Sequence, residues 1–271
     1  MIVAVFNQSG GVGKSTLTRD LGFELFSRGL KVLLIDADPQ GTLGFFFGIY
    51  PHGCPKTDMF WSGICGSEDP GQPPIAQAEC GISLGLANKT LVADEILLMQ
   101  QHDPARLLSV LEPLKEVYDF ILIDCPPRIS ELTIQILFAT DGLLIPVQTE
   151  AKSVMMVSEI QEEIARAQRR RKNLKLPQLK ILGVVPTLYN PQRVLHRHHL
   201  QEIKETVCDQ LGYHLFPPIR DLISLAEAGT KATPLKLYDP KCSVNDDIAQ
   251  IADTVAGHVR PKSSLREVVN G

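Results

Sequence analysis

Short apolar runs alternate along this chain with longer segments in which hydrophobic positions recur every three to four residues. The short runs are apolar at successive positions, which is typical of strands buried on both faces of a sheet. They predict strands at residues 2–6, 31–35, 82–86, 120–123, 142–146 and 180–185. The longer segments predict helices at residues 15–28, 91–99, 104–117, 129–139, 153–172, 194–211 and 245–259.

Strands and helices follow each other in turn almost throughout this order. Parallel strands need long crossover connections, and the expected helices supply them. The pattern therefore predicts an α/β fold, namely a doubly wound, mostly parallel twisted sheet with helices on both faces. Residues 48–80 break the order because they hold many Pro, Gly and Cys residues and show no period. We expect them to form a long excursion on the rim of the sheet.

Composition and charge limit the classes of protein that fit. At 271 residues and 44% hydrophobic content, we expect one domain over residues 1–259 and a flexible C-terminal tail over residues 260–271. The net charge of −4 gives no global basic field, so binding to nucleic acid needs a local basic patch. The six cysteines form no C-x-x-C pair, which favours reduced thiols in the cytoplasm. No apolar run reaches the roughly 18 residues that span a bilayer, so no membrane association is expected.

The candidate chemistry begins after the first expected strand, where residues 7–16 form a glycine-rich loop that opens a helix. Backbone N–H groups and a helix N-terminus directed at one spot stabilise a phosphate. Lys14 adds a cation that can reach the β- and γ-phosphates, and the Ser15 hydroxyl can ligate Mg²⁺. The loop therefore predicts a nucleoside triphosphate site formed by the following residues: Gly10, Gly11, Val12, Gly13, Lys14, Ser15 and Thr16.

Acidic residues follow two other expected strands. Asp36 and Asp38 come after the second strand, and Asp124 ends a later one. Because ligands lie at the carboxyl ends of the strands in such a sheet, we expect these carboxylates near the phosphates. The expected metal site for Mg²⁺ consists of Ser15, Asp36 and Asp124, with Asp124 acting through a water molecule. Asp38 is expected to orient the attacking water.

Together, residues 10–16, 36–41 and 123–127, with the later residues 225–228 and 234–243, resemble the ParA/MinD group of deviant-Walker ATPases in its ParA branch. The resemblance implies that the chain binds ATP and Mg²⁺ and forms a homodimer when ATP is bound. It implies slow hydrolysis of ATP to ADP and phosphate, stimulated by an adaptor or activator protein. It also implies non-specific binding to the DNA of the nucleoid and the positioning or segregation of a cargo.

One loop position departs from the family. Its loop carries a lysine that reaches across the dimer to the partner's phosphates, and this chain has Ser9 there. Losing a cation at a transferring phosphate can lower the rate by about 10³-fold. Either hydrolysis is very slow, or another cation substitutes. Lys152, on the same rim as the loop, is our catalytic candidate, and a solvated lysine at a helix N-terminus is the alternative. The resemblance also places the base near Thr187 and Pro218.

A few residues bear on which cargo the protein positions and on which other ATPase classes fit the sequence. A serine at position 9 resembles the maintenance-of-carboxysome-distribution A proteins, a ParA-like subgroup, and favours carboxysomes as the cargo. A plasmid- or chromosome-partition ATPase is the close alternative. A MinD-like membrane switch needs an amphipathic tail, and residues 260–269 contain Pro261 and lack aromatic side chains. An ATPase resembling the nitrogenase iron protein needs a cysteine pair, and no second cysteine is clearly placed beside Cys125.

Two basic stretches are candidates for a DNA surface. A solvated helix face is the alternative interpretation of both. The first stretch lies at one helix end and contains Arg166, Arg169, Arg170, Arg171, Lys172 and Lys175. The second contains Arg193, His196, Arg197, His198 and His199, without a carboxylate or cysteine to complete a metal site.

Overall fold

The computed structural model of the chain describes residues 1–65, 72–101, 103 and 105–258. The expected tail, residues 260–271, lies outside the described residues. The same holds for residue 104, at which we expected a helix to begin, and for residue 259, at which we expected the last helix to end.

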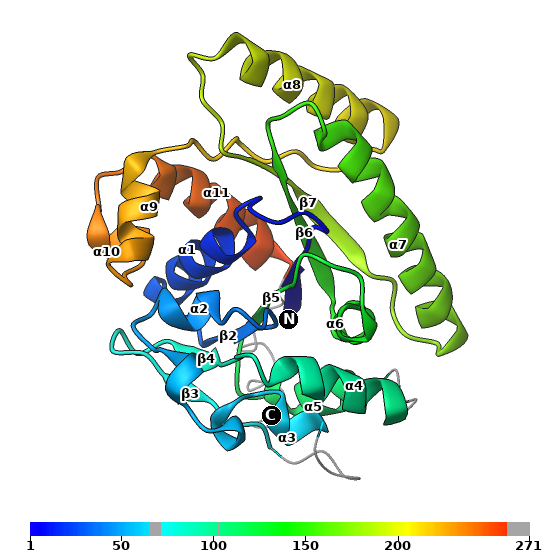
Figure 1. Ribbon diagram of the computed structural model, residues 1–271. Helices are drawn as coiled ribbons and strands as arrows, with labels where there is room; N and C mark the ends of the chain where they lie inside the picture. The colour runs from blue at the N-terminus through cyan, green and yellow to red at the C-terminus, as the bar shows by residue number, and fades with distance from the viewer. Residues whose placement is uncertain (66–71, 102, 104, 259–271) are drawn as a thin grey trace, which may run out of the picture.

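A twisted sheet forms the centre of the molecule and has seven strands within the described residues (Figure 1). The strand order is β3-β4-β2-β5-β1-β6-β7, and every neighbouring pair is parallel except β3 and β4. The strands are β1 Ile2–Val5, β2 Val32–Asp36, β3 Ala76–Gln77, β4 Ser83–Gly85, β5 Phe120–Asp124, β6 Gly142–Gln148 and β7 Lys180–Thr187. All but β3 match the predicted strands to within two residues at each end.

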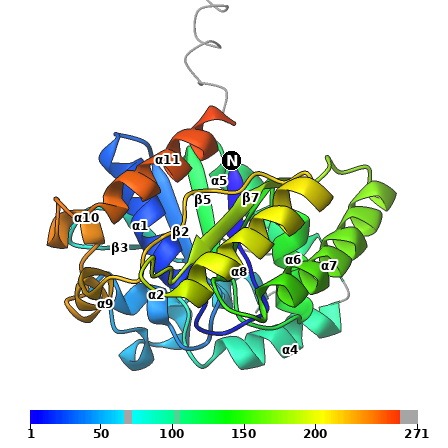
Figure 2. The ribbon, with the colours of Figure 1, turned by 90° about the horizontal axis from the view of Figure 1, so that it is seen from above.

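Helices cover both faces of this sheet (Figures 1 and 2). On one face α1 packs against α11, and on the other α6 packs against α4, α5 and α7. The helices are α1 Lys14–Ser27, α2 Thr42–Phe45, α3 Ser62–Cys65, α4 Leu91–Gln101, α5 Arg106–Leu114, α6 Glu131–Ala139, α7 Ser153–Asn173, α8 Val194–Lys204, α9 Ile223–Thr230, α10 Leu235–Tyr238 and α11 Val244–Gly257. The predicted α/β class, a doubly wound and mostly parallel sheet, is confirmed.

The core has two layers because successive side chains of a strand point to opposite faces of the sheet. Val3 and Val5 of β1 lie in the same apolar cluster as Leu21 of α1. Ala4 of β1 lies in the other cluster with Ile136 of α6. Both layers are covered by helices, so each central strand is apolar at successive positions, which is the pattern that predicted them.

The described part of residues 48–80 is more deeply buried than the predicted excursion. Phe60 and Trp61 are fully buried, and Nε1 of Trp61 donates a hydrogen bond of 2.7 Å to the carbonyl oxygen of Asp36. The same segment supplies β3, the antiparallel edge strand. These elements are short and held by tertiary contacts, so they leave no hydrophobic period in the sequence.

Other differences arise near the C-terminal half. The single helix predicted at residues 194–211 divides into α8 and a π-helical segment, η3, at Glu205–Gln210. The pattern does not predict α9, since this helix of eight residues buries only Ala228 and Gly229. The four-residue α10 is too short to show a period.

Candidate nucleotide site

The order of the strands brings the loop and the carboxylates to one edge of the sheet. In the register of the parallel strands, Asp124 at the end of β5 lies opposite both Val5 of β1 and Asp36 of β2. The glycine-rich loop follows β1 directly. The predicted loop and two of the predicted carboxylates therefore meet at the carboxyl edge, where ligands bind in sheets of this class.

The loop is shaped to receive an anion. Gly11 and Gly13 have φ values of 74° and 84°, in the left-handed region that glycine adopts without strain. Gly10 is exposed beside them, and α1 begins at Lys14 with no side-chain cap on its first N–H groups. Those groups and the positive end of the helix dipole stabilise a phosphate.

Lys14 is held inside the loop. Its side chain is buried, and Nζ donates a hydrogen bond of 2.7 Å to the carbonyl oxygen of Ser9. Burial lowers the pKa of Lys14, and the nearby Asp124, Cys125 and Asp38 oppose that shift. An ammonium group has three donors, so the contact to Ser9 leaves donors for a phosphate oxygen.

Two side chains at the ends of the neighbouring strands β6 and β7 donate hydrogen bonds to the loop backbone. Nε2 of Gln148, at the end of β6, donates a hydrogen bond of 3.0 Å to the carbonyl oxygen of Gly11. Oγ1 of Thr187, at the end of β7, donates one of 2.9 Å to the carbonyl oxygen of Val12. The loop backbone is thus fixed before any ligand arrives, which lowers the entropic cost of binding.

Asp124 is the least satisfied polar group of the site. Its carboxylate is buried, and within the described residues neither oxygen has a hydrogen-bond partner. Burial raises the pKa of Asp124 to about 7, although the Ser15 hydroxyl and the Lys14 ammonium lie close enough to oppose the rise. Ser15 and Thr16 lie in the first turn of α1 and are half-buried. A buried carboxylate without partners is costly unless something binds to it.

Asp36 and Asp38 have different environments. The two carboxylate oxygens of Asp36 accept hydrogen bonds of 2.9 Å from the N–H groups of Asp38 and Leu43. Burial and the neighbouring Asp124 raise the pKa of Asp36 well above its usual range. Asp38 is half-buried and accepts a hydrogen bond of 2.9 Å from the N–H of Gln40. Asp36 thus fixes the loop that carries Asp38, whereas Asp124 has both oxygens available.

These residues fit a magnesium ion that is shared with a nucleotide. Mg²⁺ keeps several waters and takes few protein ligands when phosphate oxygens are present. The described residues contain no group of three or more His, Cys, Asp or Glu side chains that could hold a metal. The Ser15 hydroxyl would ligate the ion directly, and the unpartnered oxygens of Asp124 would hold one of its waters. The ion would neutralise charge on the phosphates.

A cavity of about 360 Å³ opens beside the start of α1. Gly13 and Thr16 line the end next to the phosphate loop, Thr187 lines another wall, and α9 closes the far side. Of the two predicted base contacts, Thr187 therefore borders the cavity. Pro218 is not among the residues that line the cavity; it directly precedes Ile219, which is. An apolar cavity of this size with a few polar groups suits a small ligand such as a nucleotide base.

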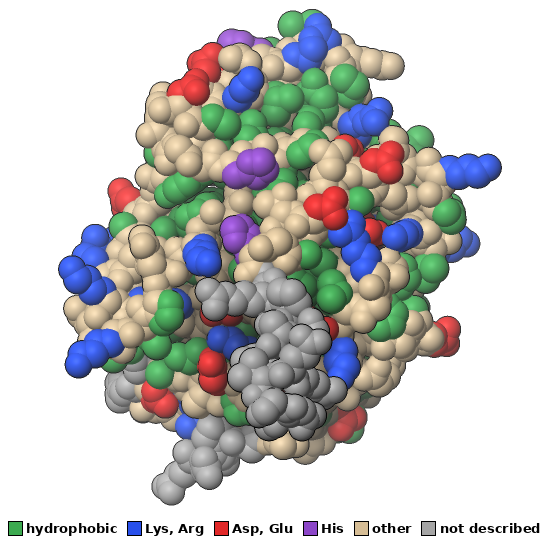
Figure 3. Space-filling model, turned by 180° about the vertical axis from the view of Figure 1, so that it is seen from behind, with side chains coloured by type: hydrophobic (Ala, Val, Ile, Leu, Met, Phe, Trp, Pro, Cys, Tyr) green, Lys and Arg blue, Asp and Glu red, His purple; other side chains and the backbone are tan. Residues whose placement is uncertain are grey.

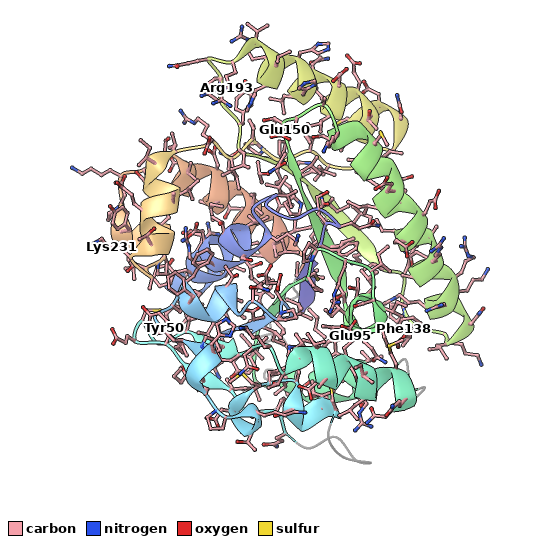
Figure 4. The ribbon with its side chains drawn as sticks, viewed as in Figure 1. Tyr50, Glu95, Phe138, Glu150, Arg193 and Lys231 are labelled. Atoms are coloured by element: carbon pink, nitrogen blue, oxygen red, sulfur yellow. The ribbon has the colours of Figure 1, made fainter. Side chains whose placement is uncertain are left out.

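Lys152 lies on the same rim but away from the buried centre. It is the exposed N-cap residue of α7, four positions after Gln148, which contacts the phosphate loop. Figure 4 labels Glu150 on this loop and Arg193 on the neighbouring one. Within the part of the chain that the structure describes, the Lys152 side chain has no hydrogen bond or ion pair. The structure therefore leaves Lys152 unpaired on the rim and does not bring it into contact with Lys14 or Asp124.

Sequence reasoning missed residues that hold the rim together. Nδ2 of Asn7 donates to the carbonyl oxygen of Pro146 over 2.6 Å, and its Oδ1 accepts from the N–H of Ser9 over 2.9 Å. Nδ1 of His196 accepts from the N–H of Asn190 over 3.2 Å and lies 3.0 Å from Oγ1 of Thr149. A polar residue directly after a buried strand was the available signal for Asn7. The sequence gives no such signal for His196, because one partner, Thr149, is 47 residues away and the other is a backbone N–H.

The structure corrects the first basic stretch. Arg171 is buried, and its guanidinium donates to the carbonyl oxygens of Leu137, Phe138 and Thr140 at the end of α6. It therefore closes a helix end and is not part of a surface patch. The other five cations of the stretch are exposed. On the described part of the face in Figure 3, Lys and Arg side chains are scattered among Asp and Glu side chains.

The phosphate loop between β1 and α1, with Asp124 one strand away, makes this chain a P-loop nucleoside triphosphatase in class. A family model described as an AAA domain matches residues 1–178. The chain is also 30% identical to the chromosome partitioning protein ParA of Caulobacter vibrioides over 267 residues, which covers 97% of this chain and 96% of that protein. The chain belongs to the ParA/MinD family of P-loop ATPases.

Two solved structures share the fold over most of its length. Apo McdA of Cyanothece has a TM-score of 0.80 at 24% identity and covers 94% of this chain and 98% of its own; its D38A form has been solved with ATP. Cobyrinic acid a,c-diamide synthase of Mycobacterium smegmatis, with a bound ATP analog and magnesium, has a TM-score of 0.77 at 28% identity and covers 95% and 94%. Nucleotide and Mg²⁺ thus bind in proteins of this fold. Among the described residues of our chain, no helix has the length and apolar character needed to span a bilayer.

Proposed function

We propose that the chain is a ParA-type ATPase that binds MgATP, pairs with a second copy, and hydrolyses ATP slowly until a partner protein stimulates it. The carrying observation is the pair of buried, unpartnered Asp124 oxygens beside Ser15 and Lys14. This buried carboxylate has at most the nearby Ser15 hydroxyl to offset its burial, and a magnesium-bound water would supply a further partner. The bracing of the phosphate loop by Gln148 and Thr187 supports the same proposal.

In the proposed reaction the residues of this chain position the nucleotide, the ion and the attacking water and neutralise the charge of the phosphates. They form no covalent bond to the substrate. The loop N–H groups and Lys14 bind the phosphates, and Ser15 with Asp124 holds the ion and its water. Asp38, on a loop fixed by Asp36, orients the attacking water. Lys152 takes the place of the cation that Ser9 does not supply, by approaching the phosphates of the second copy. Positioning and charge are what phosphoryl transfer requires from a protein.

Exposed apolar side chains on the rim support pairing through this edge. A helix that follows a parallel strand begins at the carboxyl edge, so the first turns of α7 and α8 share the edge with the phosphate loop. The helix α9 follows no strand, but it lines the cavity beside that loop. Met155, Leu195 and Ile223 in the first turns of these three helices are 68%, 66% and 78% exposed. Large apolar side chains gathered at one edge favour coverage by a second protein surface. A second copy facing this edge would also bring its Lys152 towards the nucleotide.

The proposed function also includes the positioning of a cargo and binding to DNA. Ser9 favours carboxysome positioning, and the match to ParA along almost the full chain favours plasmid or chromosome partition as the alternative. In either case the dimer binds DNA non-specifically through exposed cations and locates to the nucleoid in the cytoplasm. A MinD-like switch on a membrane surface ranks below both. Co-sedimentation with DNA and with liposomes, each with and without ATP, separates these functions; loss of DNA binding at high salt is expected.

The proposed pairing of two copies is tested by introducing a negative charge among the exposed apolar side chains of the rim. In sedimentation velocity with Mg²⁺ and a non-hydrolysable ATP analogue, Met155→Asp is expected to remain monomeric, because dimerisation would bury an unpaired carboxylate. Val117 is the matched control, since it is 51% exposed and precedes β5 at the opposite edge. Val117→Asp is expected to dimerise like the unmodified protein. Dimerisation of Met155→Asp at the same nucleotide concentration contradicts the proposed interface.

A further inference from the structure

A hollow between α6 and α7 lies outside the nucleotide site; we name it the α6–α7 hollow. Its volume is about 90 Å³. Its floor is apolar: Leu137, Phe138 and Ala167 are buried, and Ile134 and the exposed Ile129 complete it. Figure 4 labels Phe138 on α6 at this seam. A cavity of roughly 150 Å³ can hold benzene, so this smaller hollow of about 90 Å³ suits an apolar group no larger than one aliphatic side chain.

Cations border this apolar floor on the α7 side. Arg166 and Arg170 line the hollow, and Arg169 is exposed beside them on the same helix. Glu163 also lines it, but its carboxylate pairs with Arg166 over 2.8 Å. Across the residues that the structure describes, neither Arg169 nor Arg170 has a carboxylate within ion-pair distance. The border therefore carries an excess of positive charge directly beside an apolar depression.

We propose that the α6–α7 hollow docks an acidic segment of a partner protein, which inserts one aliphatic side chain and places carboxylates against Arg169 and Arg170. Charge complementarity selects the acidic segment, and the apolar floor selects a protein over a nucleic acid. A DNA backbone has no aliphatic group to insert, and cations alone would suffice to bind it. The combination of a central apolar anchor and flanking charge is typical of protein recognition sites.

The hollow is connected to the nucleotide site along the chain. Ile129 on its floor is only five residues after Asp124. Between them, Arg128 forms an ion pair of 2.5 Å with Glu95 of α4, which holds this segment in place. A side chain that packs against Ile129 would therefore contact the segment that follows Asp124.

The test measures fluorescence anisotropy of a short labelled peptide with leucines on one helix face and glutamates on the other. The probe controls are the same peptide with lysines in place of the glutamates and a short labelled DNA duplex. Arg170→Glu reverses a bordering charge, and Ala167→Leu fills the hollow without changing charge. Lys231→Glu is the matched control, because it makes the same charge change at an exposed position just after α9 (Figure 4).

The proposal expects the glutamate peptide to bind the unmodified protein and the lysine peptide not to bind. Arg170→Glu and Ala167→Leu are each expected to weaken binding by about tenfold or more, and Lys231→Glu to leave it unchanged. Absence of binding by the glutamate peptide overturns the proposal, as does equal weakening by Lys231→Glu. Duplex binding that depends on Arg170 but not on Ala167, without peptide binding, assigns the surface to DNA instead.

The same samples separate this proposal from the proposed ATPase function. The peptide is titrated without nucleotide, and ATP binding is measured in parallel by calorimetry. Arg170→Glu and Ala167→Leu touch no group of the nucleotide site, so both are expected to bind ATP like the unmodified protein. A chain that binds the peptide but no ATP refutes the ATPase proposal and leaves the docking surface intact.

Discussion

At the scale of single residues, the burial of the Asp124 carboxylate opposes the stability of the folded chain. Its usual pKa is near 3.8, and burial raises it to about 7 in the folded chain. The folded state therefore holds a proton that the unfolded state releases between these two values. Stability contributed by this group is lost as the pH rises through that window, since the unfolded state then binds fewer protons.

Asp124→Asn is accordingly expected to stabilise the ligand-free protein and to abolish ATP hydrolysis. The shift of about three pKa units corresponds to roughly 4 kcal/mol at pH 8, and to less than half of that at about pH 5. Urea unfolding in EDTA at both pH values measures the difference between the variant and the unmodified protein. An equal difference at both pH values contradicts the assigned pKa.

Lys152 is the other residue whose role can be isolated. Lys152→Ala is expected to bind ATP and to dimerise, because the side chain contacts nothing in the phosphate loop. Its ATP turnover is expected to fall by about tenfold or more, since a cation opposite the transferring phosphate is lost. Lys231→Ala is a control for removal of an exposed lysine elsewhere. If Lys152→Ala dimerises and turns over at the unmodified rate, Lys152 does not replace the missing loop lysine.

Residue types at fixed spacing predicted much of this site, because its chemistry requires them. A glycine at the positive φ of position 13, a lysine next to it and an aspartate at a strand end can be recognised in sequence. Arg171 could not be assigned in this way. In the sequence it is one of six neighbouring cations, and only the fold shows that its guanidinium faces the last carbonyl groups of α6.

At the scale of elements, the long buried strands and helices were predictable because burial on both faces leaves a continuous apolar run. The two-residue β3, the four-residue α2 and α10, and the short α9 were not, because tertiary contacts determine them. Trp61 illustrates the reason: its indole N–H is satisfied by Asp36, a residue 25 positions earlier that no local pattern connects to it.

The packing of α1 on β2 gives a prediction at the same scale. A Cβ at Gly22 would lie 2.4 Å from Cδ2 of the fully buried Leu34, so an alanine there would force that side chain to move within the core. Gly22→Ala is expected to lower the free energy of unfolding by about 1–3 kcal/mol through overpacking. Gly257→Ala has no neighbour within 4 Å and is expected to be neutral or slightly stabilising. Urea unfolding compares the two, and equal stability would contradict the packing argument.

At the scale of the whole molecule, one edge of the sheet combines the features that the account needs. The phosphate loop, the carboxylates, Lys152 and the exposed apolar side chains of α7 and α8 all lie at the carboxyl ends of the parallel strands. The α6–α7 hollow lies to the side of this edge, so a partner protein can dock while two copies face each other. Strand order, which sequence alone did not fix, is what brings these groups together.

The most direct measurement is the mass of the Asp38→Ala protein in sedimentation velocity, with and without Mg²⁺ and ATP. This variant is expected to bind ATP without consuming it. We expect a mass of 29.9 kDa without nucleotide and twice that mass with MgATP. A mass that stays at 29.9 kDa while calorimetry shows saturation with ATP would contradict the claim that the nucleotide pairs two copies of this chain.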